Sequence, residues 1–191
     1  MRLSIMGVLL CATLVACVNV MPQKDFNLEK MAGKWWAVGF ASNAKWFMNR
    51  KAGMKMGTSM MLPTAGGNLD ISSAMRNSDG SCWRMTELAK KTDIPGRFTF
   101  TSQRWNNEND MRVVAVQYDD FALIHTIKTK HGVTDVLNKL FSKSVWLPAC
   151  LKLIHTFRFS CFVSFITVSL WSLVLAWSCY RWGCGNLVIL C

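Results

Sequence analysis

Apolar and β-prone residues recur in eight short stretches between residues 35 and 141, and polar turn residues separate them. The turns contain Gly, Asn, Asp or Pro, which supply the backbone angles and local hydrogen bonds of tight turns. No long stretch has the 3.6-residue period of an amphipathic helix. The pattern predicts an all-β fold of eight antiparallel strands, closed into an up-and-down β-barrel with room for one small ligand. The predicted strands are residues 35–41, 54–62, 69–75, 82–88, 97–102, 111–118, 121–129 and 133–141, with turns at 65–67, 77–80, 94–96, 106–109, 119–120 and 130–132.

The N-terminal segment differs from this pattern. Arg2 is followed by a nearly unbroken apolar run from Leu3 to Val18, and the small residues Ala16 and Cys17 near the end of that run offer a cleavage point. A positive start, a short apolar core and small residues are typical of a signal peptide, so residues 1–20 predict secretion. The run is shorter than the about 20 residues that a spanning helix needs. A second interpretation stays open, since residues 14–17 resemble a bacterial lipobox in which Cys17 carries a lipid.

The C-terminal tail, residues 144–191, also departs from the strand pattern. Residues 159–180 contain no charged side chain, and Arg158 and Arg181 flank them. A helix of that length is long enough for a hydrocarbon core of about 30 Å. The chain therefore divides into a signal peptide (1–20), a barrel domain (21–143) and an atypical apolar tail with a predicted transmembrane helix at about 159–180. Membrane anchoring through this helix is the alternative to free secretion.

Charge and composition change the picture only when they are assigned to these segments. The chain of 191 residues has a net charge of +11, but residues 21–143 carry 18 bases and all 11 acids, or +7. The bases alternate with acids and no nucleic-acid-binding motif is present, so we expect no nucleic-acid partner. The three histidines are scattered without cysteines or carboxylates at zinc-like spacing, and there is no phosphate-binding glycine loop. We expect neither a metal nor a cofactor.

Short motifs in the barrel domain resemble those of one known family. Phe26-Asn27, Lys30 and the pair Gly33 and Trp35 stand at the head of the first predicted strand. This arrangement resembles the signature of the lipocalins, within the calycin superfamily. Residues 40–46 and 50–52 look like the first loop of prostaglandin-D-synthase-type lipocalins. Tyr118 keeps the tyrosine of the second family motif, and the third motif resembles residues 140–144. The resemblance covers about residues 25–144.

The resemblance implies roles for individual residues. Gly33 allows the chain to turn into the barrel, and Trp35 packs across its closed end. Lys143 occupies the place of the arginine that stacks on this tryptophan, and a lysine is expected to make a weaker cation–π contact. The expected ligand-binding residues, which correspond to cavity positions in the family, are Trp46, Met56, Phe100, Trp105 and Phe141. The expected basic rim, which could attract a carboxylate, comprises Lys34, Lys45, Arg50, Lys51, Arg97 and Arg104.

The resemblance to this family also bears on catalysis. Isomerases of this subfamily use a cavity cysteine on the second strand as nucleophile, and a thiolate is the competent species. Gly57 stands at that place in this chain, and Ala37 stands where the family offers a hydroxyl to the sulfur. We therefore expect no catalytic residue and no enzyme activity. The alternative is an isomerase with a displaced nucleophile.

The tail does not match the family, in which a long helix, a short strand and a terminal cysteine follow the barrel. Cys82 lies at the fourth-strand disulfide position, and Cys150 or Cys191 could replace its usual partner. Three explanations stay open: an aberrant or alternatively spliced 3′ end, a membrane segment, and a tail that folds onto the barrel. The predicted function is extracellular binding and transport of a small hydrophobic molecule such as a retinoid, a fatty acid or a haem breakdown product. The sequence sets no oligomeric state.

Overall fold

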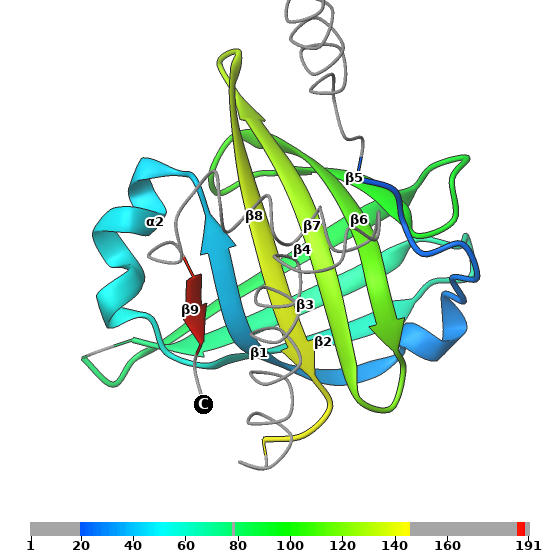
Figure 1. Ribbon diagram of the computed structural model, residues 1–191, viewed down its shortest axis with the longest axis horizontal. Coiled ribbons are helices and arrows are strands. Elements are labelled where there is room, and N and C mark those ends of the chain that lie inside the picture. Colours follow the sequence, from blue (N-terminus) through cyan, green and yellow to red (C-terminus); the bar gives the residue numbers. More distant parts are fainter. Residues whose placement is uncertain (1–19, 78, 146–186, 190–191) are drawn as a thin grey trace, which may run out of the picture.

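The computed structural model describes residues 20–77, 79–145 and 187–189, and its main feature is a closed antiparallel β-barrel (Figure 1). The eight barrel strands are β1 (Gly33–Ser42), β2 (Gly57–Pro63), β3 (Leu69–Arg76), β4 (Cys82–Lys91), β5 (Arg97–Ser102), β6 (Asn107–Gln117), β7 (Phe121–Lys130) and β8 (Val133–Ser142). Each strand pairs with the next along the chain, and β1 closes the barrel by pairing with both β8 and β2. The predicted eight-stranded up-and-down barrel is confirmed.

Short helices lie at the two ends of the barrel. The 3-10 helix η1 (Glu29–Met31) precedes β1, whereas α2 (Lys45–Arg50) and the 3-10 helix η2 (Lys51–Gly53) connect β1 to β2. Because neighbouring strands alternate in direction, α2 and the β3–β4, β5–β6 and β7–β8 turns lie at one end, and η1 lies at the other. We call these the open end and the closed end.

Two predicted boundaries were wrong. The turn expected at residues 106–109 lies earlier, because Asn107 already pairs with Ser102 and begins β6. The Asn109 side-chain amide donates to the carbonyl oxygens of Phe100 and Asn107, so it is satisfied within the sheet. Asn106 adopts the left-handed backbone conformation (φ 47°) that the turn requires. The second strand begins at Gly57 rather than at residue 54, after the unpredicted helices α2 and η2.

Three residues of the tail lie in the sheet. Strand β9 (Leu187–Ile189) pairs antiparallel with β1, opposite residues 39–41 (Figure 1). This part of β1 has lost β2 as a neighbour, since the β1–β2 register ends at Ala37 and Gly57. Residues 187–189 therefore occupy an otherwise unpaired edge, as the third explanation, a tail that folds onto the barrel, requires for this short segment. The remaining tail, including residues 159–180, and residues 1–19 of the predicted signal peptide lie outside the described residues.

No helix within residues 20–77, 79–145 and 187–189 is long and apolar enough to cross a bilayer.

The main hydrophobic core runs through the barrel from Met31 near the closed end to Phe47 on α2. Trp35, Met61, Leu69 and Phe98 are fully or almost fully buried there, and they come from four different strands. They alternate along each strand with outward-facing residues, as a half-buried β-strand requires. The buried face of each strand therefore points to one common interior.

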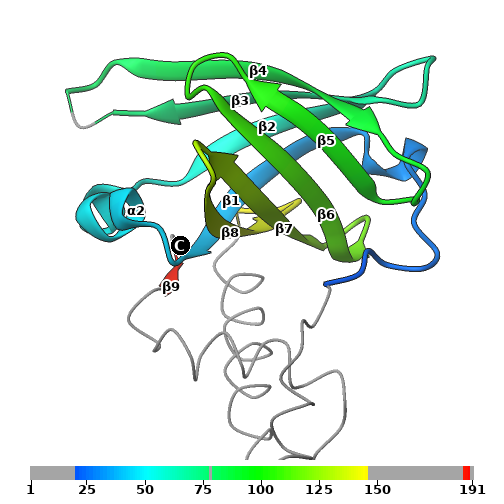
Figure 2. The ribbon, with the colours of Figure 1, turned by 90° about the horizontal axis from the view of Figure 1, so that it is seen from above.

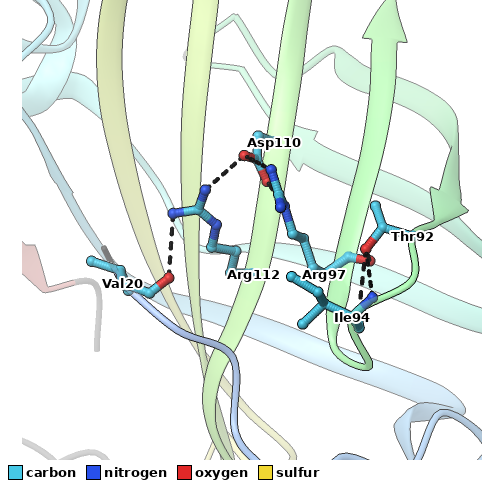
Figure 3. Close-up of polar contacts among 6 residues, drawn as sticks. All are labelled: Val20, Thr92, Ile94, Arg97, Asp110 and Arg112. Carbon is cyan, nitrogen blue, oxygen red and sulfur yellow. Dashed lines mark hydrogen bonds and ion pairs between the residues drawn. The ribbon is translucent and has the colours of Figure 1, made fainter. Parts of the chain in front are cut away.

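A buried charge cluster lies on the outer face of the barrel (Figure 3). Arg112 on β6 is only 6% exposed, and its Nη2 donates to Asp110 Oδ2 at 2.7 Å. Arg97 on β5 binds both oxygens of the same carboxylate, at 3.0 and 2.9 Å. Val20 at the start of the described chain accepts a hydrogen bond from Arg112 Nη1 at 3.3 Å. The cluster ties β5, β6 and the N-terminal segment together.

Candidate ligand-binding site

A tryptophan and a lysine close one end of the barrel. Trp35 is fully buried, and its Nε1–H donates to the carbonyl oxygen of Met31 at 2.9 Å. The Lys143 Nζ lies 4.1 Å from the centroid of the Trp35 ring and donates to the carbonyl oxygen of Ala32 at 3.0 Å. Gly33 has a φ of +109°, and a Cβ there would lie 3.2 Å from Lys143 Nζ. Glycine therefore fits both the backbone angle and the space at this turn.

Tyr118 holds the N-terminal segment against the same end. Its Oη accepts a hydrogen bond from the backbone N–H of Asn27 at 2.7 Å. The Lys30 Nζ lies 5.8 Å from the Tyr118 ring centroid. The contacts place Tyr118 outside the interior, in the cover of the closed end.

The interior between this cover and the open end is lined by alternate residues of each strand. On β4, Trp83, Met85 and Glu87 are half-buried, whereas their immediate neighbours along the strand are exposed. On β3, Ser73 and Met75 pair with Met85 and Trp83 and share their inward face. Figure 2 shows β3 and β4 on one side of the barrel, with β7 and β8 on the other. Inward side chains that keep partial exposure indicate an interior that the protein does not fill.

Strands β4 and β5 separate toward the open end. Their register contains only the pairs Lys90–Thr99 and Lys91–Phe98, both near the closed end. Beyond these pairs, a side-chain contact joins the two strands, because Ser102 Oγ donates to Glu87 Oε1 at 2.6 Å. Trp83 and Met85 therefore lie on the part of β4 that has no backbone pairing with β5.

The structure brings together only some of the predicted ligand-binding residues. Phe141 belongs to the main core and Phe100 packs against it. Met56 packs instead against Val38. Because Ala37, the residue before Val38 on β1, belongs to the main core, Val38 faces the opposite side of that strand. A register shift lies between Ala37 and Gly39, so that Ala37 and Phe40, three residues apart, both belong to the main core. Sequence spacing alone does not reveal such a shift.

The two predicted tryptophans lie at the open end. Trp46 on α2 is 40% exposed and contacts Phe47 edge-to-face, with ring centroids 5.9 Å apart. Trp105, in the β5–β6 turn, is 41% exposed. The guanidinium of Arg104 lies 5.3 Å from the Trp105 ring and 5.4 Å from the Trp83 ring. Trp46 and Trp105 therefore border the mouth of the barrel rather than its interior.

Two of the predicted rim cations lie elsewhere. Lys34, near the closed end, lies over the ring of Trp36 with its Nζ 4.1 Å from the centroid. Arg97 belongs to the buried charge cluster with Asp110. The other four, Lys45, Arg50, Lys51 and Arg104, belong to α2, η2 and the β5–β6 turn at the open end.

Two lysines that the sequence analysis missed face the interior. Lys139 lies between Leu137 and Phe141 on the inward face of β8, and burial lowers its pKa. Lys128 on β7 donates from Nζ to Asn109 Oδ1 at 2.6 Å. Burial, with the nearby charge of Lys139, lowers the pKa of Lys128 to about 8, although Glu87 opposes this shift. The alternation of Leu137, Lys139 and Phe141 was the signal that could have identified the first lysine.

The wall opposite β7 and β8 contains small and polar groups. Ser59 on β2 is buried, and its Oγ lies 2.8 Å from the Ser73 Oγ on β3. Gly57 lies two residues before Ser59, on the same face, opposite Ala37. A Cβ at Gly57 would lie 2.8 Å from the backbone oxygen of Ala74. The chain here has no room for a side chain without a backbone shift.

The family model described as "Lipocalin / cytosolic fatty-acid binding protein family" matches residues 32–152. The chain belongs to this family. A lipocalin from Rhinella marina is 39% identical over 143 residues, which cover 72% of this chain and 78% of the relative. A prostaglandin-H2 D-isomerase from Felis catus is 34% identical over 130 residues, which cover 68% of each protein.

Solved structures show the same fold. The structure of lipocalin 12 from rat epididymis has a TM-score of 0.62 at 13% identity, and covers 91% of this lipocalin and 89% of that chain. A structure of the siderocalin Ex-FABP, described as having dual ligand specificities, has a TM-score of 0.58 at 22% identity. That match covers 84% of this lipocalin and 93% of the other chain. Binding of small hydrophobic molecules is the common property of the lipocalin family, and it applies to this chain at that level.

The remaining candidate chemistry is sparse. Within the described ranges, no group of three His, Cys, Asp or Glu side chains could hold a metal ion. Cys82 is exposed at the start of β4 and is a free thiol among the described residues. Its proposed partners, Cys150 and Cys191, lie outside them.

Introducing the subfamily's cysteine is expected to destabilise this lipocalin. Gly57→Cys should lower the free energy of unfolding by about 1–3 kcal/mol, because the new Cβ overlaps the Ala74 carbonyl and forces a backbone shift. Gly57→Ala should show most of the same loss, and urea unfolding followed by circular dichroism measures both. Gly53→Ala is the matched control, since a Cβ there meets nothing within 4 Å. Equal stability of Gly57→Ala and the wild type would contradict the overlap.

Proposed function

We propose that this lipocalin is secreted and carries a small hydrophobic ligand in its barrel interior, without catalysing a reaction. The observation that carries the proposal is the inward face of β3 and β4, where Met75, Trp83 and Met85 keep partial exposure inside a closed barrel. Aromatic rings and flexible, polarizable methionines suit apolar guests of irregular shape. Phe100 and Phe141 supply apolar surface from β5 and β8.

Filling this interior is expected to abolish binding. Met85→Trp should weaken binding of retinoic acid at least tenfold, because Met85 faces the interior from β4 and the larger ring would occupy space that the ligand needs. Thr86→Trp is the matched control, since Thr86 is the next residue along β4 and is exposed. Isothermal titration calorimetry with the full chain measures both variants. Equal weakening by the two variants, or by neither, would show that the ligand binds elsewhere.

The second candidate function is a prostaglandin-H2 D-isomerase, which the names of several relatives favour. We disfavour it, because Gly57 offers no thiol and Cys82 is exposed rather than inward. Cys82 is also the only cysteine between residues 21 and 143. Turnover of prostaglandin H2 by the full chain with added thiol, above the spontaneous rate, would favour the isomerase.

Secretion and anchoring are tested together. If residues 1–20 are a cleaved signal peptide, N-terminal sequencing of protein from the medium of expressing cells should begin near residue 21. If residues 159–180 anchor the chain, the protein should stay in the membrane fraction after carbonate extraction. Peptide mass spectrometry across residues 144–191 of the native protein would test the aberrant 3′ end.

A further inference from the structure

Lys139 carries its ammonium group into apolar surroundings. On the inward face it is flanked by Leu137 and Phe141 along β8, with Ile124 opposite on β7 and Phe40 opposite on β1. All four are buried members of the main core. Among the described residues, no hydrogen bond or ion pair joins Lys139 to another group. A charged group without a partner in such surroundings costs free energy.

A second ammonium group lies beside it with only a neutral partner. Lys128 donates to the Asn109 amide oxygen, and the nearby charge of Lys139 disfavours the charged form of Lys128. The inward carboxylate of Glu87 accepts a hydrogen bond from Ser102 and makes no ion pair with Lys128 within the described residues. Asp135, opposite Lys128 on β8, makes none either. The interior thus holds two lysines that form no ion pair within the described residues, with the carboxylates of Glu87 and Asp135 on the same inward face.

An anion with an apolar body would complete this arrangement. Its charged group would supply the counter-charge that Lys139 and Lys128 lack, and charge-assisted hydrogen bonds are stronger than neutral ones. Its apolar body would cover Met75, Trp83, Met85 and Phe100, which remain partly exposed. A neutral lipophile would cover the same apolar surface and leave the ammonium groups without a partner.

We propose that the barrel interior selects amphiphilic anions, with Lys139 as the main counter-charge for the ligand's carboxylate and Lys128 beside it. This inference rests on the proposed carrier function and names its ligand class. A purely structural role for Lys139 is the competing explanation. That role predicts equal effects of a substitution on charged and neutral ligands.

The test compares all-trans retinoic acid with all-trans retinol, which share a polyene and differ at the polar end. Tryptophan quenching of the full chain should show at least about tenfold tighter binding of the acid, as expected for one buried charged hydrogen bond. Lys139→Met should remove most of this difference by weakening the binding of the acid alone. Lys139→Arg should retain the difference in affinity. Lys90→Met, at an exposed position of β4, should change the affinity for neither ligand.

The outcomes separate the two proposals. If neither retinoid binds the wild type, the carrier function itself is wrong. Equal affinities for the acid and the alcohol, or equal weakening of both by Lys139→Met, would overturn the charge selection and leave the carrier function standing.

The wild type provides a test that does not depend on folding of a variant. Raising the pH through the lowered pKa values of Lys128 and Lys139 should weaken the binding of retinoic acid and leave the binding of retinol unchanged. The ammonium groups of Lys128 and Lys139 lose their charge in this direction, and with it their attraction for the ligand's carboxylate. Because the pKa of Lys128 is lowered to about 8, an affinity for the acid that does not fall between pH 7 and about pH 9 would overturn the role of Lys128 in charge selection.

Discussion

Replacing Trp35 with alanine should lower the free energy of unfolding by about 3–5 kcal/mol, the usual cost of removing a fully buried large aromatic side chain. The substitution leaves a void at the closed end and removes the hydrogen bond to the Met31 carbonyl. It also removes the ring under the Lys143 ammonium. Urea unfolding followed by far-ultraviolet circular dichroism measures the change without using tryptophan fluorescence.

Trp105→Ala is the matched control. The Trp105 side chain is 41% exposed in the β5–β6 turn, and its main contact is the Arg104 guanidinium. An exposed cation–π pair contributes about 0.5–1 kcal/mol, so the control should lose no more than this. Similar losses for the two variants would contradict the assignment of Trp35 to the closed end of the core.

Asp110→Asn should lower the free energy of unfolding by about 2–3 kcal/mol, because it removes the counter-charge of the buried Arg112. The asparagine keeps the size of the side chain but cannot accept the charged hydrogen bonds of Arg112 and Arg97 equally well. Glu108→Gln, on the same strand at an exposed position, should change stability by less than about 0.5 kcal/mol. Equal stability of Asp110→Asn and the wild type would show that the cluster contributes little.

The same cluster predicts acid sensitivity. Burial alone would raise the pKa of Asp110, but the hydrogen bond from Arg97 and the charges of both arginines outweigh it and lower the pKa. A depressed folded-state pKa stabilises the protein above the unfolded-state value of about 4 and loses that effect as the pH falls through the folded-state value. Stability of the wild type should therefore decrease below about pH 4. The decrease should be smaller in Asp110→Asn, as urea midpoints at each pH would show.

Much of the fold could be predicted from the sequence because local chemistry and global topology agree. The turn residues of the barrel domain separate the strands, so that each strand pairs with the next. The exceptions arise from tertiary contacts. Asn107 extends β6 because Ser102 pairs with it, and β9 joins the sheet because β1 has an unpaired edge opposite it.

The candidate site was less predictable, because inward and outward faces depend on register. The family resemblance predicted Phe100, Phe141 and Met56 as ligand-binding residues. Phe141 belongs to the main core and Phe100 packs against it, whereas Met56 packs against Val38. Lys139 was missed because a single lysine within an apolar strand usually lies on the solvent face. Its two-residue spacing from Leu137 and Phe141 puts it on their face, and the structure shows that this face points inward.

Methionine methyl resonances test binding inside the barrel most directly. In the full chain with 13C-methyl-labelled methionine, titration with retinoic acid should shift the Met75 and Met85 signals, which face the interior from β3 and β4. The signal of Met60, which is 40% exposed on β2, should not move. Resonances are assigned by single Met→Leu variants. Shifts confined to Met60 and other exposed methionines, or no shifts at saturating ligand, would contradict a ligand-binding barrel interior.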